Sequence, residues 1–334
     1  MMRATQHTHR LHAASTARVS SQRGAALLAA MLLVALVATF AAGALWQQWR
    51  TLEVESAERQ RSQARWLLTG ALDWARVILR EDARAGDATA PTDHLAEPWA
   101  VPLQEARLST FLAALPDATS PSNANLLAND NALSDQVLLS GRINDMQARL
   151  NVTNLLNGDQ LDVKTVQMFE RLFSTLGLPA SQLQALTQGL LAAQRQVSAA
   201  PLMPQRVAQL TWLGLPANTL QALTPYITVL PVRTPINLNT ASAPVLLASL
   251  PGLSLADAER LVQLRERQHW ASLDAFQKAL GRDANLDSNF SVNTRYFEVW
   301  GQLRMPHTTL QERSLVQRDL TDLKVLWRES GSLQ

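Results

Sequence analysis

An uninterrupted apolar run near the N-terminus constrains the fold of this chain more than any other feature. It extends from Ala25 to Trp46, 22 residues without a charged side chain. At 1.5 Å per residue, a helix of this length reaches about 33 Å, and the hydrocarbon core of a bilayer is roughly 30 Å thick. Because apolar side chains would cover every face of that helix, the run predicts a membrane-spanning segment rather than a helix in a protein core.

The charged residues are distributed unevenly on the two sides of this run. Residues 1–24 contain four arginines and no acidic residue, and the first acidic residue of the chain is Glu53. By the positive-inside rule, we expect the N-terminus in the cytoplasm and the body of the chain on the far side of the membrane. Without those four arginines, 26 basic residues remain against 28 acidic ones. The body therefore has no excess of positive charge for binding a polyanion.

The residues after the apolar run predict that the same helix continues as an amphipathic stalk. Neither glycine nor proline occurs between Gly43 and Gly70. A helical stripe of apolar residues, which we also expect to be the partner face, follows at Ala64, Leu67, Leu68, Ala71, Trp74, Ala75 and Ile78. The helix is expected to end near Leu79, at a total length of about 80 Å. The alternative is a secretory signal cleaved after Ala44, although signal apolar regions run only about 7–15 residues.

The start of the apolar run resembles the N-terminus of type IV pilins, in which a basic leader ends in glycine and the apolar helix begins at the next residue. The resemblance implies that a prepilin peptidase cuts between Gly24 and Ala25. Pilins carry glutamate at the fifth mature position, where this chain has Ala29. A carboxylate in a bilayer needs a partner, and in pilins it is thought to pair with the α-amino group of the neighbouring subunit. A subunit at the growing tip has no neighbour ahead of it and does not need this charge. In lacking the glutamate, the chain resembles the K-type minor pseudopilin of type II secretion.

The body of the chain begins and ends with predicted strands. Residues 81–135 are rich in loop residues, with a short helix expected over Gln104–Leu115. Residues 137–139 and 150–152 are expected to pair as a hairpin around Asn144-Asp145. Alternating apolar residues at 296–303 and 323–328, joined by residues 308–320, predict a C-terminal antiparallel meander.

Residues 157–282 are expected to be helical and contain an internal repeat. LGLPASQLQAL at Leu176–Leu186 recurs as LGLPANTLQAL at Leu213–Leu223. Gly177 and Gly214 suit the left-handed residue that ends a helix, and the prolines that follow prevent its continuation. Ser181 and Asn218 are expected to cap the next helix of each copy.

Residues 236–282 resemble the helix-hairpin-helix fold, which other proteins use to bind DNA phosphates through a glycine-rich hairpin. Gly252 is present, but Ser254 replaces the second glycine of the usual G-x-G. Five basic residues against four acidic ones over this region supply little phosphate neutralisation, so a structural use is favoured. The alternative function is a membrane-anchored periplasmic DNA-binding protein of the competence type.

The sequence contains no recognisable catalytic motif, and we expect no enzyme activity. It has no cysteine, and His94, His269 and His307 are isolated from one another. A periplasmic hydrolase released after Ala44 would need a triad or metal cluster that the sequence does not reveal. Calcium binding occurs in the resembled family, and two loops rich in acid and amide side chains could hold such a cation. They contain Asn129, Asp130, Asn131 and Asp135, and Asp283, Asp287 and Asn289, but no ligand set follows from their spacing.

The order of these parts resembles the layout of the K-type pseudopilin over nearly the whole chain. EPWA (97–100), GRINDMQARLNVTNLL (141–156), INLNTASAPVLLASLPGLS (236–254) and LKVLWRE (323–329) carry this resemblance. It implies an α+β, type IV pilin-like fold with a long N-terminal helix, an antiparallel sheet and a large inserted all-α subdomain. The expected parts are a cleaved leader (1–24), a transmembrane segment (25–46), a stalk (47–80), a pilin-like region (81–156), the helical subdomain (157–282) and a C-terminal meander (283–334).

The resemblance also implies a function and partners. The chain would be a minor pseudopilin at the tip of the periplasmic pseudopilus, where it helps to initiate assembly and the export of folded proteins across the outer membrane. Its partners would be the I- and J-type minor pseudopilins, the major pseudopilin, the prepilin peptidase and the inner-membrane secretion platform. It would cross the inner membrane once, with its C-terminal domain in the periplasm, and no nucleic acid partner is expected.

Overall fold

The computed structural model describes residues 22–85, 91–113, 137–196, 200–284, 286–306 and 308–333. It divides into two compact units, Met1–Gln63 and Ala64–Gln334. Helix α1 (Gln22–Ala85) begins in the first unit and ends in the second. In the first unit, every side chain that the structure describes is exposed.

Helix α1 has no proline, and ion pairs on its exposed surface support the polar part. Arg59 pairs with Glu55 at 3.1 Å and Arg61 with Glu58 at 3.3 Å, although each exposed pair contributes only about 0.3–0.5 kcal/mol. The expected end near Leu79 was wrong, because the helix continues to Ala85. A further pair between Arg84 and Glu81 supports this last turn at 2.6 Å.

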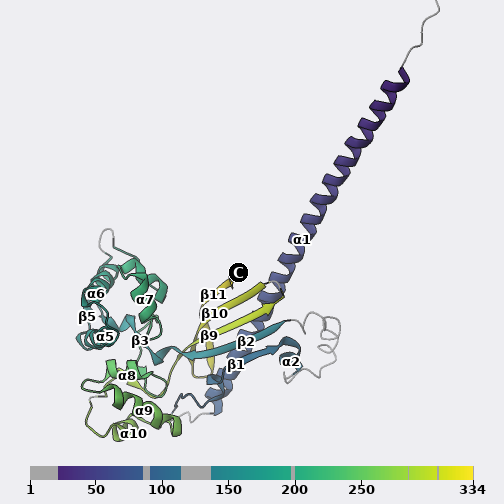
Figure 1. Cartoon of the computed structure of the whole chain (residues 1–334). Helices are drawn as coiled ribbons and strands as arrows, with labels where there is room; N and C mark the ends of the chain where they lie inside the picture. Colours follow the sequence, from purple (N-terminus) through teal and green to yellow (C-terminus); the bar gives the residue numbers. More distant parts are fainter. Residues whose placement is uncertain are drawn as a thin grey trace, which may run out of the picture. The chain divides into compact units, whose positions relative to one another are not determined.

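The second unit contains a five-stranded antiparallel sheet in the order β1-β2-β9-β10-β11. Its strands are β1 (Leu103–Arg107), β2 (Leu138–Asp145), β9 (Tyr296–Met305), β10 (Thr308–Asp319) and β11 (Asp322–Leu333). Strands β9 to β11 confirm the predicted C-terminal meander. Figure 1 shows the C-terminal part of α1 running beside the strands, and apolar side chains such as Leu72 and Phe297 share one core between them.

The hairpin predicted between residues 137–139 and 150–152 was wrong. Strand β2 continues through Asn144-Asp145 because it pairs with β9 along its whole length. Asp145 ends the strand by accepting a hydrogen bond from the backbone N–H of Gln147 at 2.7 Å. Residues Leu150–Asn151 form β3, which pairs in parallel with β6 (Ile227–Thr228) instead.

The short helix predicted over Gln104–Leu115 is only partly present. Residues Leu103–Arg107 form β1, and the helix α2 covers Leu108–Ala113. Strand β1 pairs with β2 through Ala106 opposite Leu139 and Arg107 opposite Leu138. Pairing with an available strand edge has therefore overridden the local helical pattern.

The helices between β2 and β9 share one apolar core, formed by residues from Leu150 to Phe290. They are α5 (Val163–Thr175), α6 (Ala180–Arg195), α7 (Ala217–Leu223), α8 (Ala243–Ser249), α9 (Leu255–Arg267) and α10 (Leu273–Leu280), with the 3-10 helix η4 (Val207–Leu213). Shorter elements complete the unit: η1 (Pro98–Ala100), η2 (Met146–Ala148), η3 (Val152–Leu155), β4 (Leu156–Asn157), β5 (Gln160–Leu161), β7 (Ile236–Asn237) and β8 (Phe290–Ser291).

The two copies of the repeat end one helix and start another, as predicted. Gly177 and Gly214 adopt φ values of +65° and +86°, in the region that favours glycine. The predicted caps Ser181 and Asn218 were wrong, because the helices start one residue after Pro179 and Pro216, which are their N-cap residues. The proline ring holds φ near −65° and positions the chain to enter a helix without a side-chain cap.

Candidate functional site along the first helix

The predicted stalk stripe divides into two parts in the structure. Ala64, Leu68 and Ala75 are buried against the sheet, whereas the remaining residues of the stripe are only half-buried: Leu67, Ala71, Trp74 and Ile78. The buried part packs on residues such as Leu139 and Leu303. One side of the stalk helix is thus used by the chain itself, and the adjacent side remains accessible.

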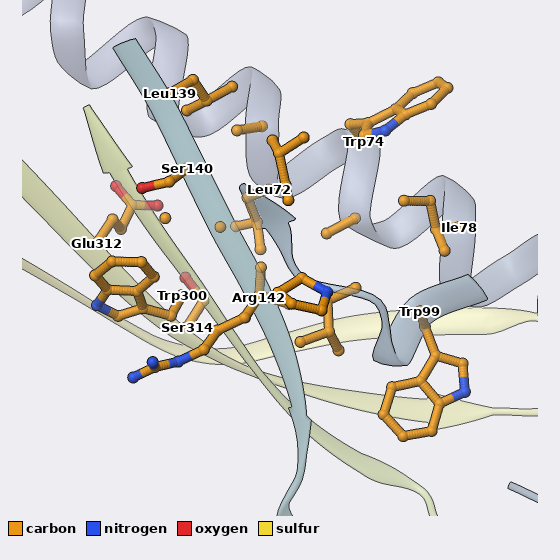
Figure 2. Close-up of a pocket in the computed structure, with 18 of the residues that line it drawn as sticks. Leu72, Trp74, Ile78, Trp99, Leu139, Ser140, Arg142, Trp300, Glu312 and Ser314 are labelled. Carbon is orange, nitrogen blue, oxygen red and sulfur yellow. The ribbon is translucent and has the colours of Figure 1, made fainter. Parts of the chain in front are cut away.

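Beside this accessible side lies a cavity of about 280 Å³ between α1 and the first strands of the sheet. Leu72, Trp74 and Ile78 line it from α1, and Trp99 lines it from η1, which precedes β1. In Figure 2, the ring of Trp74 projects outward from the helix. Val101 also lines the cavity, and most of the lining is apolar.

Several large apolar side chains on the same elements are exposed. Trp66 and Val77 lie on α1, Val101 lies just before β1 and Leu103 lies at its start; Trp66 is 75% exposed and Val101 is 66% exposed. Trp66, Gly70, Trp74 and Val77 follow one another at spacings of three or four residues, so they share one face of the helix. We call the cavity and these residues the stalk groove. Exposed apolar side chains gathered beside an apolar cavity are typical of a site of protein–protein contact.

The sequence analysis missed the edge-strand half of the stalk groove. Val101 and Leu103 lie in the part of the chain that was predicted to be loop, just before the predicted helix, and only their placement beside α1 makes them part of a surface. Trp66 was overlooked because it lies outside the stripe that begins at Ala64. Its spacing of eight residues from Trp74 was a signal that could have identified it.

The expected processing site lies at the start of α1. Gly24 and Ala25 are exposed in its first turns, and Ala29 lies one turn further on. Among the residues that the structure describes, α1 is the one helix that is long and apolar enough to cross a membrane, by length and composition.

The hairpin of the helix-hairpin-helix-like region is occupied by the chain's own side chains. Gly252 adopts φ +70°, and the guanidinium of Arg282 covers it by donating to the carbonyl of Pro251 at 2.9 Å. At the start of α9, the carboxylate of Asp257 accepts a hydrogen bond from the backbone N–H of Ser254 at 3.3 Å. Hydrogen bonds from Ser254 lower the pKa of Asp257. A carboxylate therefore lies where backbone N–H groups would bind a phosphate, which argues against DNA binding at this hairpin.

Of the two sets of residues considered for calcium, the first lies outside the described residues: Asn129, Asp130, Asn131 and Asp135. In the other loop, Asp287 is already engaged: Lys164 Nζ lies 2.5 Å from Asp287 Oδ2, and Asn289 N–H donates to Asp287 Oδ1 at 3.0 Å. An ammonium group at that carboxylate competes with any cation that would bind Asp287.

Comparison with known proteins identifies the family. Two family models described as type II secretion system (T2SS), protein K match residues 148–232 and 236–293. Type II secretion system protein K of Dickeya chrysanthemi is 30% identical over 353 residues, which cover 93% of this chain and 97% of that protein. The chain belongs to the type II secretion system protein K family. Its relative from Pseudomonas aeruginosa is 27% identical over 93% of each chain.

A solved structure shares the fold of this protein K family member. It is the GspK-GspI-GspJ complex from the enterotoxigenic Escherichia coli type 2 secretion system, with a TM-score of 0.58 and 19% sequence identity. The match covers 82% of this chain and 98% of that one. The α+β, pilin-like fold expected from the sequence is thereby confirmed: a long N-terminal helix, an antiparallel sheet and a helical subdomain. The family and the apolar helix are together consistent with an inner-membrane anchor.

Proposed function

We propose that this chain is the minor pseudopilin at the tip of the periplasmic pseudopilus, where it helps to start assembly and so supports the export of folded proteins. In this proposal, prepilin peptidase removes residues 1–24, residues 25–46 cross the inner membrane, and the domain beyond lies in the periplasm. The observation that carries the proposal is the continuity of α1, which joins an apolar membrane segment to a stalk packed on a pilin-like sheet. The role is that of a structural subunit and not of an enzyme.

Two features favour the tip over the body of a filament. The region 157–282, which we regard as an inserted subdomain, adds bulk that is hard to accommodate between subunits stacked along an axis. Ala29 also leaves the membrane helix without the carboxylate that would pair with a subunit ahead. A subunit that has no neighbour in front needs neither a clear upper surface nor that charge.

The proposed partners are the I- and J-type minor pseudopilins, the major pseudopilin, the prepilin peptidase and the inner-membrane platform. The solved relative from Escherichia coli is in a complex with GspI and GspJ. We propose that the corresponding partners of this chain contact the stalk groove. Its apolar and uncharged helix face suits the apolar side of another stalk helix.

The N-terminal residue of the protein recovered from membranes tests this function directly. Intact mass and N-terminal sequencing are expected to give a chain that starts at Ala25, with a methylated amine. A soluble chain that starts after Ala44 would instead show a discarded secretory signal, and the pseudopilin proposal would be abandoned. Replacing Gly24 with a bulkier residue, Gly24→Leu, is expected to leave the leader attached, whereas Gly43→Leu is the matched control that should be processed normally.

A further inference from the structure

Three carboxylates from two segments meet at the C-terminal end of α1. Asp82 lies in the last turn of the helix, and Asp93 and Glu97 lie in the segment that follows it. One carboxylate oxygen of each lies within 4.8 Å of the others. Asp93 is only 1% exposed, and the other two are half-buried. We call these residues the carboxylate cluster.

Among the described residues, one guanidinium forms ion pairs with this cluster. Arg318 of β10 places Nη1 2.9 Å from Asp82 Oδ2, and its Nη2 pairs with Asp93 Oδ1. The other strong donors are neutral: the backbone N–H of Thr294 donates to Asp93 at 2.7 Å, and Trp99 Nε1 and the backbone N–H of His94 donate to Glu97 Oε2 at 2.5 and 3.1 Å. Three ionised carboxylates would therefore share one permanent positive charge, so the cluster favours an added proton.

The only other basic group within reach of Glu97 is an imidazole, as far as the described residues go. His94 Nε2 lies 3.4 Å from Glu97 Oε1, and the His94 ring stacks on His269 with centroids 3.7 Å apart. Burial lowers the pKa of His94, and the neighbouring His269 lowers it further. Two stacked imidazoles do not readily carry two charges, so His94 is a poor counter-ion for Glu97 at neutral pH.

The cluster also lies at the junction between the sheet and the helical subdomain. The backbone N–H of Asp93 donates to the carbonyl of Val292 at 2.9 Å, and its carbonyl accepts from Asn237 Nδ2 at 3.0 Å. Asn237 donates as well to Asp145 Oδ2, at 2.9 Å, where β2 ends. His269 belongs to the helical subdomain, between α9 and α10. The segment that bears Asp93, His94 and Glu97 thus ties the two parts together.

We propose that Glu97 holds the proton of a latch between the sheet and the helical subdomain, closed while Glu97 is neutral and loosened when it ionises. Ionised Glu97 would place a further negative charge beside Asp82 and Asp93, with the one guanidinium already shared between them. This inference does not rest on the proposed function, because it concerns only how the sheet and the helical subdomain of the second unit are joined.

The direction of the pH effect follows from the groups around Glu97. Burial raises the pKa of Glu97 to about 7, and the charge of Asp82 adds to the rise. Because this value is above the ordinary 4.5, the contribution of Glu97 to stability is complete below that value and is lost as the pH rises through about 7. Burial likewise raises the pKa of Asp82, against the effect of Arg318, and raises the pKa of Asp145 to about 6. His94 acts in the opposite direction. Because burial lowers its pKa below the ordinary 6.5, protonation of His94 weakens the junction as the pH falls below that ordinary value.

Hydrogen exchange on the full chain in detergent tests the latch. Protection of the amides of residues 91–100 is measured from about pH 6 to pH 8 and corrected for the intrinsic exchange rate; a group that titrates near 7 predicts a loss of about tenfold. Glu97→Gln, which imitates the neutral carboxyl, is expected to remove this loss. Glu105→Gln is the control, because Glu105 of β1 is an exposed carboxylate that pairs with Arg304 of β9. This variant should lose protection as the original chain does.

A second variant keeps the test decisive if Glu97→Gln does not fold. Asp82→Asn removes a negative charge that raises the pKa of Glu97. The loss of protection is therefore expected to move to lower pH in this variant. Equal loss of protection in the original chain and in both variants would overturn the proposal. Protection that increases with millimolar calcium in the original chain, and not in Glu97→Gln, would overturn it too, because the cluster would then bind a cation instead of a proton.

Discussion

Arg318 combines a charge with an interior position. It is 8% exposed, it pairs with Asp82 and Asp93, and its guanidinium lies 4.7 Å from the centre of the Phe297 ring. Its two carboxylate partners are more than 200 positions away in the sequence. A buried cation of this kind contributes little net stability beyond an apolar replacement of the pair, but the loss of one partner leaves charges unpaired in the interior.

Replacing Arg318 alone is therefore expected to be costly. Arg318→Met should destabilise the second unit by about 3–5 kcal/mol, because Asp82 and Asp93 lose their counter-ion. Urea unfolding of the full chain in detergent measures this change. Arg304→Met is the matched control at an exposed pair with Glu105, and it should cost about 1 kcal/mol or less. Equal costs for the two variants would show that the buried pair is not needed.

Gly70 and Gly189 both lie inside helices, but in very different surroundings. A Cβ at Gly70 of α1 would have no heavy atom within 4 Å. A Cβ at Gly189 of α6 would lie 3.0 Å from the Cβ of Leu213, at the end of η4. Gly189 allows α6 to pack closely on the end of η4. Nearby, Thr219 donates to Gln182 at 2.7 Å between equivalent positions of the two copies of the repeat.

The same substitution is thus expected to have opposite effects in the two helices. Gly70→Ala should stabilise the domain by up to about 1 kcal/mol, because alanine favours a helix. Gly189→Ala should instead destabilise it by about 1–3 kcal/mol, because the added methyl group overpacks the contact with Leu213. Urea unfolding of both variants measures the difference. A stabilising Gly189→Ala would mean that α6 and η4 can move apart at little cost.

In the second unit, the stalk helix contributes one side to the core and another side to the exposed surface. One side completes the core of the sheet, through residues such as Leu68, Leu72 and Leu79, which are at most 3% exposed. The adjacent side, with the exposed Trp66 and the half-buried Trp74, belongs to the stalk groove. The first surface stabilises the domain itself, and the second is available to another subunit.

Site-specific cross-linking tests the second surface in the assembled system. The chain has no cysteine, so a single introduced thiol can carry a benzophenone cross-linker at one position only. Trp66→Cys and Val101→Cys are expected to cross-link to co-expressed I- or J-type minor pseudopilins. Val163→Cys, on the exposed surface of α5, is the control that should not. Cross-linking from Val163 alone would place the partners on the helical subdomain and contradict the proposed use of the groove.

Much of the fold followed from patterns that are local in the sequence. The helix α1, the two copies of the repeat with Gly177 and Gly214, and the C-terminal meander were all predicted, because each depends on a short period or a turn residue. The extension of β2 through Asn144-Asp145 and the strand β1 were not. Each depends on a pairing partner, β9 and β2 respectively, that no local pattern identifies.

The amino-acid sequence by itself determined that the chain has a membrane-length apolar helix continuous with an amphipathic stalk, and that its helical region is built on a repeated stop and restart. These features arise from hydrophobic periodicity and from backbone restrictions of glycine and proline, which act over a few residues. Only the tertiary structure decided which side of the stalk is buried, that Val101 and Trp74 line one cavity, and that Asp82, Asp93 and Glu97 meet beside Arg318. Those outcomes depend on packing between segments far apart in the chain, where burial and the nearness of like charges determine the energy.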